Sequence, residues 1–325
     1  MPKKFSTKNL TVLEEPSPQA AGVGIFEFTD DYSVFHHGKM PDLIPGKGEA
    51  IARMAAFNFE LLAEAGVPTH YRGSPTPDRI EFDLLSTPNP EIEPIEPGTG
   101  YYMIPLQVIF RNALPAGASV FRRLESGDVT LDQLGLASPP VAGVPLNRPL
   151  VEFTTKREEI DRFVDRDEAS AIGGLRPRDL ARIIELVEKI DVCITAHAES
   201  VGLEHADGKV EFGMLEPGEI VLVDNAGTPD ENRFLFDGRH VGKQVMRDHY
   251  LVQGLERSVQ EWAAAGRPRS SWPTPEPLPP GFVSTLSDMY RALAERWIGE
   301  PIWGAPPLED LMETVALLDS GAVRW

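Results

Sequence analysis

Apolar residues recur every three to four positions in several long stretches of this chain, a spacing that predicts amphipathic helices. The clearest predicted helix covers residues 178–201. Its apolar face carries Leu180, Ile183, Ile184, Val187, Ile190 and Ile194. A second helix is predicted after the IPGKG turn, with an apolar stripe from Ile51 to Leu62. Further helices are predicted at 243–260, 282–298 and 308–318.

Alternation of apolar and polar residues predicts strands elsewhere, because successive side chains of a strand point to opposite faces. Residues 210–214 and 219–224 alternate on either side of the turn 215–218 and predict a β-hairpin. Near the start of the chain we expect a strand from Gly22, a turn at 29–31 and a second strand. Short apolar runs predict strands at 80–85, 101–112 and 149–156. Antiparallel sheets with helices packed to one side place the chain in the α+β class.

Changes in composition along the chain predict its division into parts. Residues 1–20 are polar and predict an N-terminal arm, residues 21–105 predict a β-rich subdomain, and residues 106–265 a central α+β subdomain. Residues 266–325 begin with a proline-rich connector at 266–280, expected to lie extended on the surface, and end in helices. Proline and acidic residues at 74–100 indicate a surface excursion.

Composition and charge narrow the class of protein. The 325 residues are 42% hydrophobic and 25% charged, which is ordinary for a globular protein with a sizeable core. The net charge of −19 argues against nucleic-acid binding, because phosphate backbones require a basic surface. No apolar run is long enough to span a bilayer, and the first residues lack the apolar segment of a signal peptide. We therefore expect a soluble cytoplasmic protein without a membrane or nucleic-acid partner.

Common catalytic and nucleotide motifs are absent from the sequence. It has neither the G-x-G-x-x-G of a dinucleotide site nor the G-x-x-x-x-G-K-[ST] of a phosphate-binding loop. It also lacks the G-x-S-x-G nucleophile turn and the H-E-x-x-H zinc motif. The single cysteine, Cys193, excludes an intramolecular disulfide and a cysteine-based zinc site, and its apolar helical surroundings indicate a core residue.

The predicted hairpin carries a carboxylate on each arm, Glu211 and Asp224. If the arms pair, the two carboxylates can converge on one face, an arrangement that suits a hard cation such as Mg²⁺. Basic residues follow at Arg233, Arg239, Lys243 and Arg247. Carboxylates followed by cations would suit an enzyme that handles a metal–nucleotide and a phosphorylated substrate. The alternative is that both sets are solvated surface charges of little energetic value.

Glycines and a lysine near the N-terminus allow similar alternatives. Gly22 and Gly24 precede a predicted strand and could let the backbone approach a nucleotide phosphate, or they could form a plain turn. Lys47 lies in a glycine turn before a predicted helix, where it could contact an anion or remain solvated.

An ordered set of motifs resembles one enzyme family. In order these are IPGKG, FNFELL, MIPLQVIFRN, AGAS, EFTTK, KVEFG, LVDNAGTPDENRF and GKQVMRDHY, followed by the tail PEPLPPGFVSTLSDMYRALAERWIG. Together they resemble the phosphoribosylaminoimidazole-succinocarboxamide synthetase (SAICAR synthetase) family, over residues 22–299. The spelling FTDDYSVF and GTPDENRF looks closest to a subgroup of salt-loving archaea and high-GC bacteria. The resemblance implies an ATP-grasp-like architecture of two subdomains, with the nucleotide bound mainly by 21–105 and the metal and substrate by 106–265.

The resemblance implies an ATP-dependent ligase of purine biosynthesis. In this family the γ-phosphate of ATP activates the carboxylate of 5-amino-1-(5-phosphoribosyl)imidazole-4-carboxylate. The amine of L-aspartate then displaces phosphate and gives the succinocarboxamide, ADP and phosphate. The implied cofactors are ATP and Mg²⁺, the implied partners are these small molecules, and family habit suggests a homodimer.

The resemblance also implies roles for individual residues. Glu211 and Asp224 correspond to the carboxylates that hold the Mg²⁺–nucleotide. Lys156, in the TTK motif, and Lys209, a nucleotide phosphate contact, are the candidate catalytic residues. The candidate nucleotide-binding residues are Gly22, Gly24, Met103, Leu106 and Lys209. The candidate substrate-binding residues are Ser33, His36, Asp42, Lys47, Gln107, Arg111, Ser119, Arg233, Lys243 and Arg247.

The chain departs from the family pattern at several positions. The family's first loop, G-K-x-[KR]-D, is G-V-G-I at 22–25 and has no cation. The family's S-A-F-D is S-V-F-H at 33–36, so that His36 replaces a carboxylate, and the glutamate after the hinge is Gln107. The family's D-E after the second metal strand is D-N at 224–225, and its histidine–aspartate pair after TTK is D-R at 161–162.

These departures leave two other functions open. A change in the acidic groups around the substrate would change which ring or amine is accepted, so the chain could be a paralogue that acts on another nucleotide, for example in nucleoside-antibiotic biosynthesis. The missing loop lysine also leaves room for a nucleotide-binding protein without catalytic activity.

Overall fold

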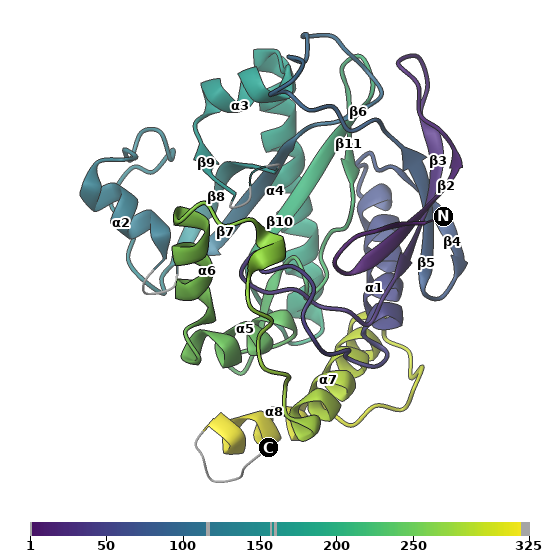
Figure 1. Ribbon diagram of the computed structural model, residues 1–325, viewed down its shortest axis with the longest axis vertical. Helices are drawn as coiled ribbons and strands as arrows, with labels where there is room; N and C mark the ends of the chain where they lie inside the picture. Colours follow the sequence, from purple (N-terminus) through teal and green to yellow (C-terminus); the bar gives the residue numbers. More distant parts are fainter. Residues whose placement is uncertain (1, 115–117, 157, 159–160, 320–325) are drawn as a thin grey trace.

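The computed structural model describes residues 2–114, 118–156, 158 and 161–319, and it has the predicted α+β architecture. Two antiparallel sheets are joined by helices that pack against them (Figure 1). The smaller sheet has the strand order β1-β2-β3-β5-β4. The larger sheet has the order β13-β12-β10-β7-β8-β9, and β6 and β11 also pair with β10.

The elements have the following bounds. The strands of the smaller sheet are β1 (Lys3–Lys4), β2 (Lys8–Glu14), β3 (Gly22–Phe28), β4 (Tyr71–Thr76) and β5 (Arg79–Leu84). Those of the larger sheet are β6 (Tyr102–Met103), β7 (Leu106–Ala113), β8 (Pro145–Thr155), β9 (Phe163–Val164), β10 (Glu204–Glu216), β11 (Glu219–Val223), β12 (Arg233–Phe236) and β13 (Arg239–His240). The helices are α1 (Lys47–Glu64), α2 (Ser119–Ser126), α3 (Arg166–Gly173), α4 (Pro177–Ser200), α5 (Lys243–Val252), α6 (Leu255–Ala264), α7 (Pro280–Ile298) and α8 (Leu308–Asp319).

Strand β10 is the centre of the larger sheet, because it pairs with β6, β7, β11 and β12. Its antiparallel pairing with β11 confirms the predicted hairpin and places Glu211 opposite Val223. Val210 and Phe212 of β10 are buried in the main core with the apolar face of α4, which lies behind β10 in Figure 1. Since side chains alternate along a strand, Lys209 and Glu211 point to the opposite face.

A buried hydrogen-bond chain joins the helices to the end of the hairpin. The indole Nε1–H of Trp297 on α7 donates to Asn58 Oδ1 on α1 at 2.7 Å. Asn58 Nδ2 donates in turn to the backbone oxygen of Ala226, just after β11, at 3.0 Å. Asn58 is fully buried, so both bonds lie inside the core. This one side chain therefore fixes α1, α7 and the segment after Asp224 relative to one another.

The N-terminal segment differs from its prediction as an arm. Strand β2 pairs along β3, with Lys8 opposite Phe28 and Leu10 opposite Phe26, so residues 8–14 belong to the sheet. The second strand predicted after the 29–31 turn does not form, apart from a single bridge between Ser33 and Lys39. Phe35 and His36 have φ angles of 49° and 62°, and this left-handed backbone ends the extended conformation.

Two long predicted elements are interrupted. The strand predicted at 101–112 is divided into β6 and β7 at Pro105, which has no N–H for a ladder hydrogen bond. The helix predicted at 243–260 is divided into α5 and α6, because Gly254 adopts a left-handed φ of 77° and ends the first helix. The predicted surface connector at 266–280 is largely exposed, although its Trp272 and Leu278 are buried in the core.

None of the helices in the described part of the chain is long and apolar enough to cross a membrane.

We predict that Asn58→Ala destabilises the protein by about 3 kcal/mol, because it leaves the indole N–H of Trp297 and the carbonyl of Ala226 buried without a partner. Urea unfolding followed by circular dichroism measures the change. Asn147→Ala on the exposed end of β8 is the matched control, expected to change stability by less than about 0.5 kcal/mol. Equal stability of the two variants would contradict the role given to Asn58.

Candidate functional site

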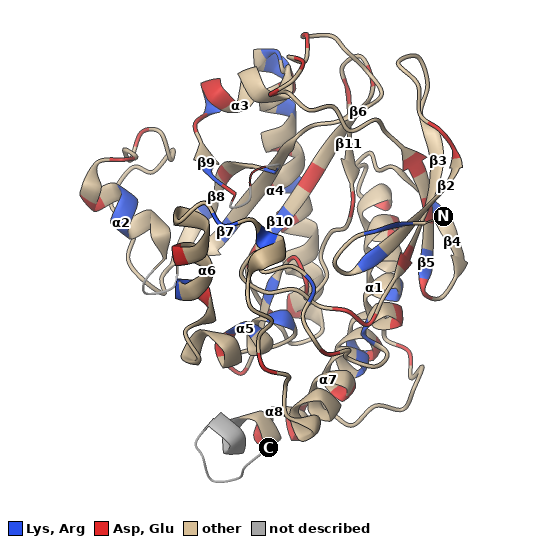
Figure 2. Cartoon of the chain, viewed as in Figure 1, with Lys and Arg blue, Asp and Glu red and all other residues tan. Residues whose placement is uncertain are grey.

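One face of the larger sheet carries the charged side chains, and the other face packs on α4. Asp207, Lys209 and Glu211 alternate with apolar or small residues along β10, so all three point away from α4. Figure 2 shows acidic and basic bands following one another along this strand. The pairing of Asp207 with Arg111 on β7 and with Arg233 on β12 extends the charged face across three strands.

The hairpin brings the two predicted metal carboxylates together with lysines. Glu211 on β10 lies opposite Val223, the last residue of β11, and Asp224 directly follows Val223. The side chain of Glu211 is 5% exposed and forms an ion pair with Lys156. Asp224 Oδ1 lies 2.5 Å from Lys8 Nζ. The charges of Lys8 and Lys156 both act on Asp224, so Glu211, Asp224 and the two lysines form one cluster.

The charges of this cluster hold Asp224 ionised. Burial alone would raise the pKa of Asp224, but Lys8, Lys156 and Lys209 together hold that pKa well below its usual range. Two hard oxygen donors suit Mg²⁺, which binds one or two carboxylates together with substrate phosphates. The described residues contain no group of three or more His, Cys, Asp and Glu side chains that could form an all-protein metal site. The donor set therefore fits a metal shared with a nucleotide.

Lys8 was not predicted to lie beside these carboxylates, because it belongs to the segment predicted as an arm. Its Nζ also lies 4.4 Å from the centre of the Phe26 ring. The signal was present in the alternation of Leu10 and Val12 with polar residues, which is typical of a strand. The loop at 22–25 has no lysine, and β2 brings a cation to Asp224 instead.

Packing explains the two glycines of the first loop. A Cβ added at Gly22 would lie 2.1 Å from the backbone oxygen of Glu14. A Cβ added at Gly24 would lie 2.8 Å from the ring of Phe82. Both positions require glycine for strand packing alone, so their predicted approach to a nucleotide has no separate support in this geometry.

An apolar cluster adjoins the carboxylates at the end of the hairpin. Leu85, Val221 and Val223 form its buried centre, and Met103 packs against them. A Cβ added at Gly213 would lie 2.2 Å from Leu85 Cδ1, so this glycine makes room for the cluster. Met103 thus lies where an apolar ring could bind. Leu106 does not, because its side chain is buried in the main core.

Carboxylates hold the predicted arginines of the sheet in place. Arg111 Nε lies 3.2 Å from Glu152 Oε2, and Arg111 Nη1 lies 3.5 Å from Asp207 Oδ2. Arg233 donates to both carboxylate oxygens of Asp207, with Nε 2.8 Å from Oδ1. The side chain of Arg111 is only 10% exposed, so its pairs are well shielded from water, whereas Arg233 is 27% exposed. The arrangement fixes two guanidinium groups side by side on the charged face.

A second group of cations surrounds Asp230 at the start of α5. Lys47 Nζ lies 2.6 Å from Asp230 Oδ2, and the Tyr290 hydroxyl donates to Oδ1 at 2.8 Å. Burial lowers the pKa of Lys243 to about 8, although Asp230 partly opposes the shift. Burial and the nearby Arg233 also lower the pKa of Arg247. Arg247 Nε is buried without a hydrogen-bond partner in the described structure, which indicates a place for an anionic ligand.

Gln107 lies on the charged face, and His36 lies near it. His36 occupies the left-handed turn after Ser33, and its Nδ1 lies 3.8 Å from Asp161 Oδ2. The charge of Lys209 affects the pKa of His36, Asp161 and Asp224, so Lys209 lies near both this pair and the carboxylates. Gln107 pairs with Thr154 and, by alternation, shares a face with Ile109 and Arg111.

Two residues predicted to bind substrate, Asp42 and Ser119, lie in parts of the fold not described above. Asp42 Oδ2 accepts a hydrogen bond from the backbone N–H of Leu278 at 2.8 Å and another from the Tyr32 hydroxyl at 3.2 Å. Its carboxylate therefore holds the proline-rich connector in place. Its predicted contact with the substrate stays a prediction. Ser119 is the first residue of α2 and follows Ala118. Arg123 of the same helix pairs with Glu152, which also pairs with Arg111, and the substrate contact of Ser119 stays a prediction.

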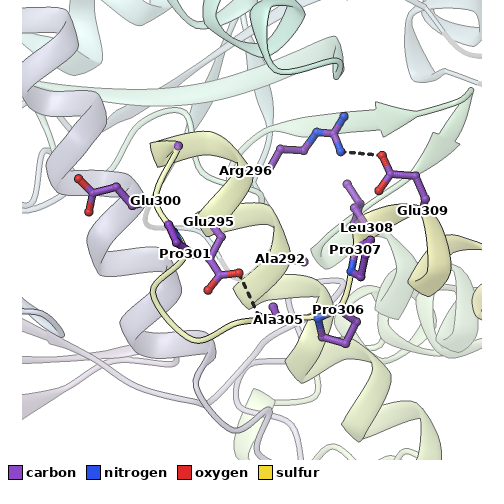
Figure 3. Close-up of a pocket in the computed structure, with 11 residues that line it drawn as sticks. Ala292, Glu295, Arg296, Glu300, Pro301, Ala305, Pro306, Pro307, Leu308 and Glu309 are labelled. Carbon is purple, nitrogen blue, oxygen red and sulfur yellow. Dashed lines mark hydrogen bonds and ion pairs between the residues drawn. The ribbon is translucent and has the colours of Figure 1, made fainter.

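A surface depression between α7 and α8 is separate from the charged face (Figure 3). Glu295, Arg296 and Glu309, which line it, already have partners. Glu295 accepts backbone hydrogen bonds from Gly304 at 2.7 Å and Ala305 at 3.0 Å. Arg296 Nη1 lies 3.0 Å from Glu309. These bonds attach α8 and the segment before it to α7, so the residues of the depression serve to stabilise the fold.

Proteins of one enzyme family are similar to this chain in sequence. The SAICAR synthetase family pattern matches residues 17–263. A phosphoribosylaminoimidazole-succinocarboxamide synthase of Thermoplasma acidophilum is 34% identical over 283 residues, covering 85% of this chain and 93% of the relative. A protein of Archaeoglobus fulgidus, named provisionally as the same synthase, is 36% identical and covers 94% of this chain and 97% of the relative.

Solved structures share the fold. The structure of a SAICAR synthetase in complex with ADP superposes on this chain with a TM-score of 0.64 at 23% sequence identity. The superposition covers 92% of this chain and 98% of that synthetase. The Saccharomyces cerevisiae SAICAR synthase complexed with SAICAR gives a TM-score of 0.66 at 19% sequence identity. That superposition covers 92% of this chain and 94% of the yeast protein. Sequence motifs, charged face and fold agree, and this chain belongs to the SAICAR synthetase family.

Proposed function

We propose that this protein joins L-aspartate to the carboxylate of 5-amino-1-(5-phosphoribosyl)imidazole-4-carboxylate, with conversion of ATP to ADP and phosphate. The observation that carries the proposal is the cluster of Glu211 and Asp224 with Lys8 and Lys156, beside the cations of α5. It lies within the segment that matches the family. The ADP and SAICAR named for two structural neighbours support a nucleotide and this product.

The first step of such a ligase brings two anions together, a carboxylate and the γ-phosphate of ATP, so their repulsion must be screened. Glu211 and Asp224 would hold Mg²⁺, which neutralises charge on the nucleotide phosphates when bound. Lys156 and Lys209 lie beside these carboxylates and would screen the transferring phosphate. In that role Lys156 exchanges its carboxylate partner, Glu211, for a phosphate oxygen.

The cations around Asp230 would bind the 5′-phosphate or the imidazole carboxylate of the ribonucleotide. Arg247 offers a buried Nε without a described partner, and Lys243 lies beside it. Arg111 and Arg233 are already fixed by Asp207, so they are preorganised and lose little conformational freedom on binding. The apolar cluster around Met103 would receive the adenine.

The assay that tests the proposal measures ADP formation with ATP, Mg²⁺, the imidazole ribonucleotide and L-aspartate. We expect ADP release that depends on aspartate, and mass spectrometry should show the succinocarboxamide. ADP release with another nucleotide acceptor, but none with this one, would favour the divergent paralogue. Well-folded protein that binds ATP–Mg²⁺ without turnover of any acceptor would favour the non-catalytic alternative.

We predict that Glu211→Gln lowers kcat/KM for ATP by about 100-fold, because it removes a metal carboxylate and leaves Lys156 without its partner. Nucleotide titration should show weaker ATP–Mg²⁺ binding in the same variant. Glu216→Gln is the matched control at the exposed end of the same strand, expected to stay within about twofold of the wild type. Unchanged affinity in Glu211→Gln would remove the metal assignment.

We predict that ribonucleotide binding takes up close to one proton at about one pH unit above the pKa of Lys243. The free amine has a pKa of about 8, and a bound phosphate or carboxylate raises it, so the lysine becomes protonated on binding. At about two pH units below that pKa the lysine is already charged, so its uptake disappears.

Calorimetry in buffers of different ionisation enthalpy counts the protons taken up. Lys243→Met should abolish the uptake above the pKa. Lys39→Met removes an exposed lysine whose partner is Asp31 and should leave it unchanged. The same proton count in Lys243→Met and the wild type would show that another group titrates.

A further inference from the structure

The His36–Asp161 pair is the titratable group that the proposed phosphate chemistry leaves unused. His36 projects from the turn after Ser33, and Asp161 lies just before β9 on the other side. The turn is fixed by the His37 backbone N–H, which donates to Val34 O at 2.9 Å, and by His37 Nε2, 2.9 Å from Pro273 O. Left-handed backbone at two consecutive non-glycine residues, Phe35 and His36, is costly and holds the imidazole in position.

The surroundings of the pair favour a neutral imidazole. His36 is 42% exposed in its side chain and Asp161 is 21% exposed, so a ligand can reach His36 while Asp161 is mostly shielded. Burial lowers the pKa of His36, Asp161 opposes that shift, and Arg269, Arg247 and Lys209 add to it. Burial raises the pKa of Asp161, while His36, Lys209 and Arg269 lower it and Glu211 raises it.

The structure brings two residues that are far apart in the sequence to face each other. His36 Nδ1 and Asp161 Oδ2 lie 3.8 Å apart, so an imidazole faces a carboxylate. The charge of Lys209 affects the pKa of both groups, which places the pair near the charged face.

We propose that His36 is the proton acceptor for the L-aspartate amine and that Asp161 is its positioning residue. This inference rests on the proposed ligase function. Among the described residues, none hydrogen-bonds to Nε2 of His36, so that nitrogen can accept a proton while Nδ1–H faces Asp161. The 3.8 Å separation is longer than a hydrogen bond, and such contacts commonly shorten once substrate is bound.

The proton and electron changes are as follows. The aspartate ammonium first loses one proton to water and becomes a neutral amine. Its lone pair forms the C–N bond at the acyl carbon, and the C–O bond to phosphate breaks, with the electron pair leaving on the phosphate oxygen. The nitrogen then carries one excess proton, which His36 Nε2 accepts. Asp161 stabilises the imidazolium, which later releases the proton to water.

The first test separates this step from activation of the carboxylate. His36→Gln should lower aspartate-dependent kcat/KM by about 100-fold or more. ADP formation with hydroxylamine as acceptor should fall by less than about tenfold, because its weakly basic nitrogen loses a proton to water without a strong base. His249→Gln on α5 is the matched histidine control. A wild-type aspartate rate in His36→Gln overturns the proposal. No ADP from the wild type with either acceptor overturns the proposed function itself.

The second test uses pH and the reciprocal exchange. Neutral His36 is the active form, so kcat/KM for aspartate should rise as pH passes the pKa of His36. Asp161→Asn removes a group that raises this pKa, so the rise should move to lower pH, an effect that a purely structural role would not produce. His36→Asp and Asp161→His should each be impaired, and the double variant should regain at least tenfold over either. A double variant no more active than the singles, or an unmoved pH profile in Asp161→Asn, overturns the pairing.

Discussion

Charge balance in a shielded environment is the constraint on which this site depends. A buried charge is tolerated only with a partner of opposite sign, and β10 places Asp207, Lys209 and Glu211 on one face while its other face is buried on α4. Each carboxylate of the face therefore has a cation: Arg233 for Asp207, Lys156 for Glu211 and Lys8 for Asp224. Although the chain carries a net charge of −19, these three carboxylates each have a cation as partner.

The same balance explains how ligands of high charge could bind without large rearrangement. A metal with a nucleotide brings both signs of charge, so it can replace the lysine–carboxylate pairs by metal–carboxylate and lysine–phosphate pairs. The charged groups that would bind the metal and the phosphates are thus already close together in the free protein, which reduces the reorganisation required during reaction. The cost falls on the lysines, which must change partners, and Lys243 shows by its low pKa that one cation is held with incomplete compensation.

Local sequence patterns predicted the parts of this structure that depend on local rules. The α4 helix and the β10–β11 hairpin follow from spacing, and the motifs around Glu211 and Asp224 identified the carboxylate cluster. Patterns could not place Lys8 beside Asp224, because that contact joins residues 216 positions apart. They also could not show that the carboxylate of Asp42 accepts a hydrogen bond from Leu278, and its substrate contact stays a prediction. His36 and Asp161 appeared as two separate losses, since only the fold shows that they face each other.

The position of Lys8 shows how a missing cation in a loop should be interpreted. Charge acts through space, so Lys8 pairs with Asp224 although the two residues are 216 positions apart. A loop without a lysine therefore does not by itself show that the nearby carboxylates lack a cation. The net charge within reach of each carboxylate describes such a site better than the residue type at any single position.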